Sequence, residues 1–397
     1  MARAVTGDHV MFEECIPFFR PERIEENEGA ENINELIGYI LLDFELEQTL
    51  EFKDFKILPT IRAHLSPPYS SFIAPVILPR WLNERHNAHL FCIALGAIVS
   101  FVTSRPVKSL RDDYLIGREL DERTIQTLSI HFPVLTAGPG SHNYRLSKEY
   151  IERYYKGLKD TIELLYAAPY TLYARLMKAI RLAHLAHNNK REDFSLAYYL
   201  LVSSIEVITQ KATKVPKIKH DLEIQWEQMA KSDETISALL AEYKKLRSND
   251  KKLRERFVEF VFEYCPPKEW EKLEHPQESS LPSEDRENWE WITKKSWDEI
   301  YPEDLQNEDS KDELLREIIS DSYKYRSKFT HEGSAPPHRR PNSYNRFFDV
   351  EHQTKEINGK YEFNQIILAN YSLLAFIAKD SIIAYAKSKV SSEKTKE

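Results

Sequence analysis

The second half of the chain carries the clearest helical pattern. Apolar residues recur there every three or four positions, which predicts amphipathic helices over residues 150–168 and 170–188, separated by Pro169. The next segment, 193–212, is apolar nearly all round and begins with Asp193, a residue suited to capping a helix N-terminus. We therefore expect a buried, central helix at this position.

Two further helices are predicted toward the C-terminus. Residues 312–331 place their apolar side chains on one helix face, with acidic residues in the first turn and Gly333 just beyond the end. Residues 364–387 also carry a broad apolar face and predict a closing helix. A charged segment of about 215–311 precedes them; its helical part gives way to a stretch rich in Pro, Glu, Ser and Trp, which is typical of an insertion.

The first part of the chain is less regular. A helix is predicted over 81–102, and the partial alternation of aromatic and branched residues in 35–46 and 50–58 indicates strands. The length of 397 residues fits two or three domains, and the pattern changes near residue 145. We expect a mixed, mostly helical N-terminal domain of unknown type over 1–145, with sensing or regulation as one hypothesis, and a helical domain over 146–390.

Composition favours a mainly α fold. Hydrophobic residues make up 42% of the chain, and it has only 10 glycines, far below the usual share of about 7%, which disfavours glycine-rich phosphate loops. The three cysteines are odd in number and widely spaced, and no signal-peptide pattern is present, so a cytoplasmic protein is expected. The most apolar run, 90–102, is much shorter than the ~20 residues that span a bilayer, so no membrane association is expected.

Charge is unevenly distributed along the chain. Residues 221–320 hold 27 acidic and 15 basic residues, a net charge of −12, whereas the whole chain has a net charge of −8. The remaining residues therefore carry a net charge of +4. A site for a polyanion is expected outside this acidic block.

The segment YRSKFTH, residues 325–331, separates Arg326 from His331 by four residues and places the polar Ser327 directly after the arginine. This pattern resembles the signature of the HEPN ribonuclease superfamily. The stretch RSKFTHEG resembles the Apea-like branch, and the apolar helix that contains Glu206 and the closing helix extend the resemblance over about 150–390. Residues 1–145 match no family that we can name.

The resemblance implies a helical bundle with metal-independent endoribonuclease activity, without metal or cofactor. It also implies a toxin or antiviral defence effector that acts on RNA, works as a homodimer, and in some cases pairs with a protein partner or antitoxin. In HEPN toxins controlled by adenylylation, a tyrosine usually stands two places after the histidine. Gly333 stands there in this chain, which argues against that form of control.

Arginine and histidine suit this chemistry. Cleaving RNA without a metal needs a proton acceptor for the 2′-hydroxyl, a proton donor for the leaving 5′-oxygen and positive charge near the phosphate. Histidine titrates near working pH and arginine pairs with phosphate through two donors. On an ideal helix Arg326 and His331 point about 140° apart, so fraying of the last turn or a second chain is needed to bring such groups together.

Three residues at or near the motif remain open to interpretation. Glu206 either orients Arg326 through an ion pair or satisfies a serine or tyrosine in the core, because a buried unpaired carboxylate is costly. Ser327 and Thr330 either support the site or only form local bonds to the helix backbone.

Basic residues gather around the motif. Between residues 322 and 346 the net charge is +5, and tyrosine and phenylalanine residues lie among the cations, a combination used to bind single-stranded RNA. The alternative is a solvated loop with core aromatics. The candidate RNA-binding residues are Lys324, Lys328, Arg339, Arg340 and Arg346.

Two other functions compete with the ribonuclease. In the first, the protein is a non-catalytic helical interaction or scaffold module whose acidic block binds a partner. In the second, a metal-dependent hydrolase uses the histidine pairs His184 with His187 and His86 with His89, although no nearby acid or thiol completes either set of ligands.

Overall fold

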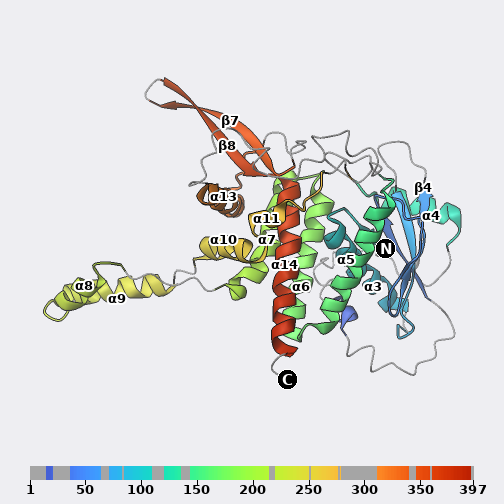
Figure 1. The fold of residues 1–397 in the computed structure, drawn as a ribbon, viewed down its shortest axis with the longest axis horizontal. Coiled ribbons are helices and arrows are strands. Elements are labelled where there is room, and N and C mark those ends of the chain that lie inside the picture. Colours follow the sequence, from blue (N-terminus) through green and yellow to red (C-terminus); the bar gives the residue numbers. More distant parts are fainter. Residues whose placement is uncertain are drawn as a thin grey trace, which may run out of the picture.

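The computed structural model describes residues 15–20, 36–63, 71–82, 85–109, 120–135, 144–213, 220–249, 252–275, 278, 311–338, 346–357 and 360–394. Over these residues the fold is mainly helical, as predicted, with two small antiparallel sheets (Figure 1).

A small antiparallel sheet organises the described N-terminal region. Its strands lie in the order β2-β3-β5-β1-β6, and β4 also pairs with β5. In the central pair, Ile37 of β1 faces Ile77 of β5 and Leu42 faces Phe72. The strands predicted in 35–46 and 50–58 are confirmed as β1, β2 and β3. The strand bounds are Ile37–Leu42 (β1), Leu50–Glu51 (β2), Lys56–Ile57 (β3), Ile61–Ala63 (β4), Ser71–Ile77 (β5) and Lys108–Ser109 (β6).

Helix α3 (Arg85–Thr103) covers one face of this sheet. It lies between the sheet and helices α5 (Lys148–Ala167) and α6 (Tyr170–Asn189), so most of its side chains are apolar and buried. Gly38 on β1 permits this close packing, since a Cβ atom there would collide with the sulfur of Cys92 on α3. The short helices η1 (Ile16–Phe19) and α4 (Glu122–His131) complete the described region. α4 was not predicted from the sequence.

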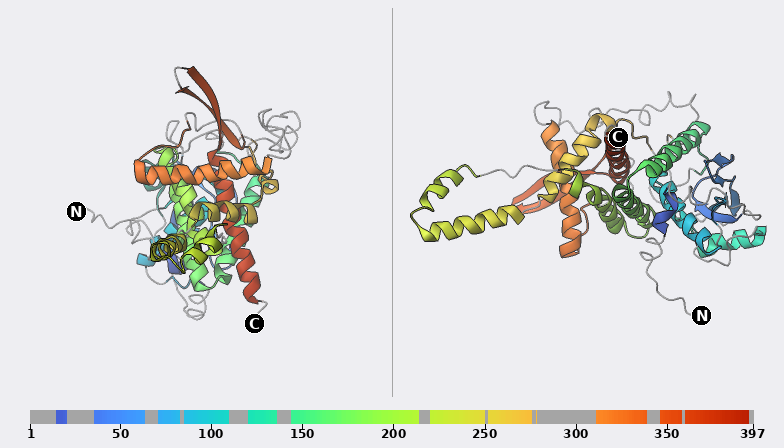
Figure 2. Two further views of the ribbon diagram at one scale, coloured as in Figure 1. Left: turned by 90° about the vertical axis from the view of Figure 1, so that its left-hand side faces the viewer. Right: turned by 90° about the horizontal axis from the view of Figure 1, so that it is seen from below.

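The helical part is built around α7 (Phe194–Ala212). The carboxylate of its N-cap, Asp193, accepts a hydrogen bond of 2.9 Å from the backbone N–H of Leu196. α7 is central, as predicted, because α6, α10, α13 and α14 all pack against it (Figure 2). The bounds of its neighbours are Lys148–Ala167 (α5), Tyr170–Asn189 (α6), Leu253–Tyr264 (α10), Pro267–Trp270 (α11), Lys311–Glu332 (α13) and Tyr371–Lys394 (α14).

The prediction of one closing helix over 364–387 is wrong in its first part. Residues 364–369 belong to β8 (Lys360–Ala369), which pairs with β7 (Phe348–Ile357) in a long hairpin, and α14 begins only at Tyr371. The side chain of Asn370 starts the helix by accepting a bond of 2.8 Å from the backbone N–H of Leu373. The aromatic and branched residues before Asn370 favour a strand, and tertiary pairing with β7 decides the outcome.

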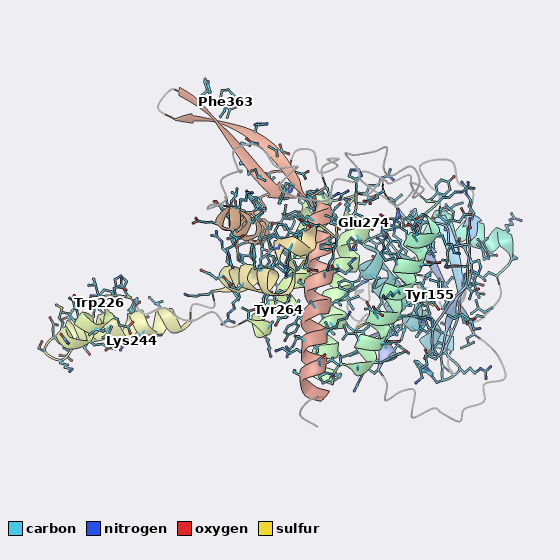
Figure 3. The ribbon with its side chains drawn as sticks, viewed as in Figure 1. Tyr155, Trp226, Lys244, Tyr264, Glu274 and Phe363 are labelled. Atoms are coloured by element: carbon cyan, nitrogen blue, oxygen red, sulfur yellow. The ribbon has the colours of Figure 1, made fainter. Side chains whose placement is uncertain are left out.

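Two hairpins project from the body of the molecule. Helices α8 (Glu223–Met229) and α9 (Glu234–Asn249) form a helical arm inside the predicted insertion, with Trp226 packed between His220 and Tyr243 (Figures 1 and 3). The β7–β8 hairpin carries Phe363, whose 80% exposure puts an aromatic ring in solvent (Figure 3). Most of the second half of the insertion lies outside the described residues.

One hydrophobic core runs through the described parts of both predicted domains, because α3 packs on α5 and α6. The domain boundary near residue 145 therefore stays a prediction. Cys15, Cys92 and Cys265 are buried free thiols. None of the helices in the described ranges combines the length and apolarity needed to cross a bilayer.

Candidate functional site

Helix α13 carries both residues of the Arg-His motif. It ends at Glu332, and Gly333 follows with a φ angle of +66°, a left-handed conformation that glycine adopts without strain. The backbone N–H of Gly333 donates to the carbonyl of Phe329 over 3.2 Å and closes the last turn. His331 thus lies in the last turn of the helix, as predicted.

Arg326 is fixed by an ion pair to the neighbouring helix. Its terminal nitrogen lies 2.7 Å from Glu206 on α7, and the side chains of the two residues are 21% and 7% exposed, respectively. The hydroxyl of Tyr323 donates to the other oxygen of Glu206 over 3.0 Å. Both interpretations of Glu206 are therefore correct at once, since its carboxylate pairs with the arginine and also satisfies a buried tyrosine.

Aromatic rings enclose the guanidinium group of Arg326. The ring centres of Tyr199 and Tyr323 lie 5.5 and 5.8 Å from its central carbon, within the range of cation–π attraction. Sequence reasoning missed both tyrosines in this role. The available signal was the three-residue spacing between Tyr323 and Arg326, which puts the two on one face of α13.

The electrostatics of this cluster keep the hydroxyl of Tyr323 protonated. Burial, followed by the charge of Glu206, raises the pKa of Tyr323 to about 12, so its hydroxyl keeps the proton that it donates. Within the described residues, the Nε atom of Arg326 has no hydrogen-bond acceptor. The guanidinium is therefore not fully committed to Glu206.

His331 lies in the last turn of α13, and on an ideal helix it points about 140° away from Arg326. Its side chain is exposed, and the described residues offer it no hydrogen-bond or ion-pair partner. The structure thus brings Arg326 and Glu206 together, whereas the side chain of His331 stays accessible to a molecule in solvent.

The helix residues beside the motif behave differently from one another. Thr330 donates to the carbonyl of Arg326 over 3.1 Å, so it forms the local bond that was one of its two interpretations. Ser327 is half-buried, and its side chain forms no hydrogen bond with another described residue, so neither of its two interpretations is decided. Lys324 and Lys328 are exposed, and Lys324 lies 3.4 Å from Asp321 in a surface ion pair.

The expectation that Arg346 lies on an RNA-facing surface is wrong. This residue is 3% exposed and lies 3.4 Å from the carboxylate of Glu278, because the chain before β7 returns into the core. Phe347 and Phe348 beside it are buried as well, as the core alternative predicts. Arg339 and Arg340 lie outside the described residues.

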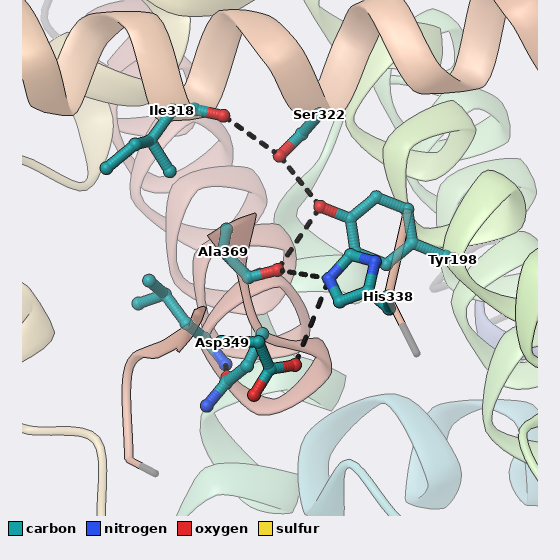
Figure 4. A network of polar contacts seen from close by, with 8 residues as sticks. Tyr198, Ile318, Ser322, His338, Asp349 and Ala369 are labelled. Carbon is teal, nitrogen blue, oxygen red and sulfur yellow. Dashed lines mark hydrogen bonds and ion pairs between the residues drawn. The ribbon is translucent and has the colours of Figure 1, made fainter. Parts of the chain in front are cut away.

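A hydrogen-bond network anchors α13 to the base of the β7–β8 hairpin (Figure 4). The hydroxyl of Tyr198 on α7 lies 2.8 Å from that of Ser322 and donates to the carbonyl of Ala369 over 3.3 Å. His338 donates from Nε2 to the same carbonyl over 3.2 Å, and this nitrogen lies 3.9 Å from Asp349. Burial lowers the pKa of His338 to about 4, so a neutral imidazole joins the segment after α13 to the hairpin.

The histidine pair on α6 has structural partners. His184 donates to the carbonyl of Val107 over 2.7 Å, and His187 is bonded to the hydroxyl of Tyr371 over 3.1 Å. No group of three or more potential metal ligands occurs among the described residues. The side chain of His86 lies outside what the structure describes, and His89 is buried.

The chain was also compared with known proteins. No family model, no curated protein and no solved structure matches it. A function for this chain is therefore inferred from the chemistry of α13 and its neighbours.

Proposed function

We propose that the protein is a metal-independent endoribonuclease in which Arg326 binds the scissile phosphate and His331 transfers protons. The observation that carries this proposal is the contrast between the two side chains on one helix. Glu206 holds Arg326 in a fixed orientation, while His331 stays exposed at the helix end. The resemblance of residues 325–331 to the HEPN signature supports the same assignment.

The reaction uses the 2′-hydroxyl of RNA as the nucleophile. Its proton passes to a neutral histidine, its oxygen bonds to phosphorus, and the bond to the 5′-oxygen breaks as a protonated histidine supplies a proton to it. Arg326 offsets the charge that develops on the phosphate oxygens. The exposed Lys324 and Lys328 precede His331 by seven and three residues, which places them on the face of α13 that carries the histidine, and they attract the polyanion to it.

The active unit in this proposal is a homodimer. The ideal separation of about 140° between Arg326 and His331 means that the histidine of each chain faces away from the arginine of the same chain. A two-fold axis beside the end of α13 supplies a second copy of each group, because an isologous interface brings the same patch together. Two histidines in one cleft then serve as acid and base. We further propose a role in growth arrest or antiviral defence.

The direct test is incubation of purified protein with total RNA in the presence of EDTA. We expect cleavage to survive the chelator and to leave 2′,3′-cyclic phosphate and 5′-hydroxyl ends, which end-labelling detects. Loss of cleavage in EDTA with recovery on adding Mn²⁺ or Zn²⁺ would refute this chemistry.

A second candidate function is a non-catalytic interaction module. The helical arm favours it, because Ile224, Leu239 and Leu246 on the arm are all more than half exposed. An isolated helical hairpin gains little stability from such side chains unless a partner covers them. A protein that cleaves no RNA, but loses a co-purifying partner when residues 220–249 are replaced by a short linker, would favour this function over the first.

A further inference from the structure

A cleft separate from the Arg-His site lies where the N-terminal region meets the helical part. Its volume is about 630 Å³, within the range of small-molecule sites. Helices α5 and α14 form its walls, the turn after α3 forms its floor, and the segment after α10, which includes Glu274, flanks it (Figure 3). Arg326 and His331 do not line it.

The floor of the cleft is a turn held in a costly conformation. Ser104 has a φ angle of +54°, a left-handed conformation that costs a residue with a Cβ atom roughly 1–2 kcal/mol. The hydroxyl of Ser100 donates to the carbonyl of Arg105 over 2.6 Å and secures the turn. As a result, Nε of Arg105 lies 3.2 Å from Asp43, a carboxylate side chain that is only 4% exposed.

Two charged groups in the cleft keep unused hydrogen-bonding capacity. The Oδ1 atom of Asp43 is buried and has no hydrogen-bond partner among the described residues, which normally costs about 1–3 kcal/mol. The ammonium group of Lys190 packs over the ring of Tyr371 at 4.6 Å, and no carboxylate in the described ranges forms an ion pair with it. Such an arrangement leaves one acceptor and one cation available to a ligand.

The charge around Lys190 is also unusual. Burial lowers its pKa to about 8; the charge of Arg105 acts in the same direction and that of Asp349 opposes it. His187, the nearby imidazole, is neutral, since burial lowers its pKa to about 3. An anion bound between Lys190 and Arg105 would relieve the repulsion between these two cations.

The walls offer aromatic and apolar surface above this polar floor. Tyr264 and Phe376 line the cleft from α10 and α14, and Ala375 and Ile383 add apolar contacts. Charged side chains also line these walls: Arg153, Lys272, Lys379 and Lys387 are basic, and Asp160, Glu269, Glu274 and Asp380 are acidic. Sites for small organic ligands combine apolar surface with placed polar groups in this way.

We propose that this cleft binds a phosphate ester of nucleotide size that carries free hydroxyl groups. Its phosphate lies between Lys190 and Arg105, one hydroxyl donates to Oδ1 of Asp43, and its remaining body packs against the aromatic wall. Nucleoside monophosphates and sugar phosphates share this chemistry. The ligand contacts both parts of the molecule, since Asp43 and Arg105 belong to the N-terminal region and Lys190 and the wall of α14 to the helical part.

The test measures binding of 5′-AMP, 5′-UMP and ribose 5-phosphate to the full chain by titration calorimetry and saturation-transfer NMR. We expect at least one phosphate ester to bind at about 1 mM or below, and adenosine to bind about tenfold more weakly than 5′-AMP. If ribose 5-phosphate binds as tightly as the nucleotides, the ligand is a sugar phosphate. If a nucleotide binds more tightly than ribose 5-phosphate, the base is also recognised.

Four variants locate the site. Lys190→Met should weaken binding about tenfold or more, as expected for loss of one charge-assisted contact, and Lys190→Arg should retain it. Lys148→Met, which removes an 83% exposed lysine outside the cleft, should bind like the parent. Absence of binding by all three esters to the folded parent overturns the proposal. So does loss of binding in Arg326→Lys with full binding in Lys190→Met, which would move the ligand to α13.

Discussion

The carboxylate of Glu206 on α7 and the guanidinium of Arg326 on α13 meet at 2.7 Å where little water reaches them. Tyr323 occupies the other oxygen of Glu206, so the carboxylate is paired on both sides. A buried ion pair of this kind fixes orientation more than it adds stability, because desolvation offsets much of the attraction. Removing one partner, however, leaves an uncompensated charge.

We therefore expect Arg326→Ala to lower the free energy of unfolding by roughly 3–5 kcal/mol, as for other broken buried pairs. The double variant Glu206→Gln, Arg326→Met should recover much of this loss, because no buried charge remains. Urea unfolding measures both. The control is Arg316→Ala on the same helix: its pair with Glu259 is also 2.7 Å long but exposed, so its loss should be about 1 kcal/mol or less. Equal losses at the two sites would contradict this account.

Replacing His331 by alanine should abolish RNA cleavage while leaving the unfolding free energy within about 0.5 kcal/mol of the parent, because the side chain is exposed. The matched control is His352→Ala, which removes another exposed histidine, on β7. RNA cleavage and urea unfolding are compared for the three proteins. Parental cleavage by His331→Ala would show that the motif is not the active site.

Mixing two inactive chains tests the composite dimer. Arg326→Lys keeps a charge beside Glu206 but loses the planar two-pronged contact to phosphate, and His331→Ala removes the proton-transfer group. Each variant alone should be nearly inactive, and their mixture should regain a measurable fraction of parental activity through mixed dimers. Light scattering gives the mass of the species. A parent that remains fully active as a monomer at nanomolar concentration would exclude a shared site.

Acid should destabilise the protein through its buried histidines. Burial lowers the pKa of His187 to about 3 and that of His338 to about 4, whereas in the unfolded chain both take up a proton near 6.5. Between these values the unfolded state binds more protons, so each group lowers stability by about 1.4 kcal/mol per pH unit as pH falls from 6.5. The raised pKa values of Asp43 and Asp380 act in the opposite direction.

The variant His187→Gln isolates one of these contributions. Its unfolding free energy, measured by urea denaturation from pH 7 to 4.5, should fall less steeply than that of the parent. The difference in slope should be about 1.4 kcal/mol per pH unit, the value for one proton. Parallel curves for the two proteins would mean that His187 takes up its proton at the same pH in the folded and unfolded states, which would contradict the lowered pKa.

Two glycines should respond to alanine in opposite directions. Gly333→Ala should lower the unfolding free energy by about 1–2 kcal/mol, since its φ of +66° is unfavourable for a side chain even though the space around it is open. Gly96→Ala lies inside α3, where the added Cβ would make ordinary contact at 3.6 Å, and should raise stability by about 0.5–1 kcal/mol. Thermal unfolding of both variants gives the signs directly.

Local pattern was sufficient for much of the helical scaffold. The periodicity of 150–212, the break at Pro169 and the cap at Asp193 predict α5, α6 and α7 almost to the residue, because apolar spacing and capping act within one or two turns. The same local rules place Gly333 at the end of α13 and His331 in its last turn. The Glu206–Arg326 ion pair was one of two interpretations, since a carboxylate on a buried helix needs a partner.

Other features depend on partners far away in the sequence. Pairing with β7 decides that residues 364–369 form a strand, and the periodicity of a short apolar run does not show whether a pairing partner exists. The burial of Arg346 and the cleft around Lys190 arise from chain segments that only the tertiary fold brings together. Sequence determined which residues have the chemistry for a site, whereas long-range packing decided which of them are held, buried or left open to solvent, because burial depends on neighbours that sequence distance does not encode.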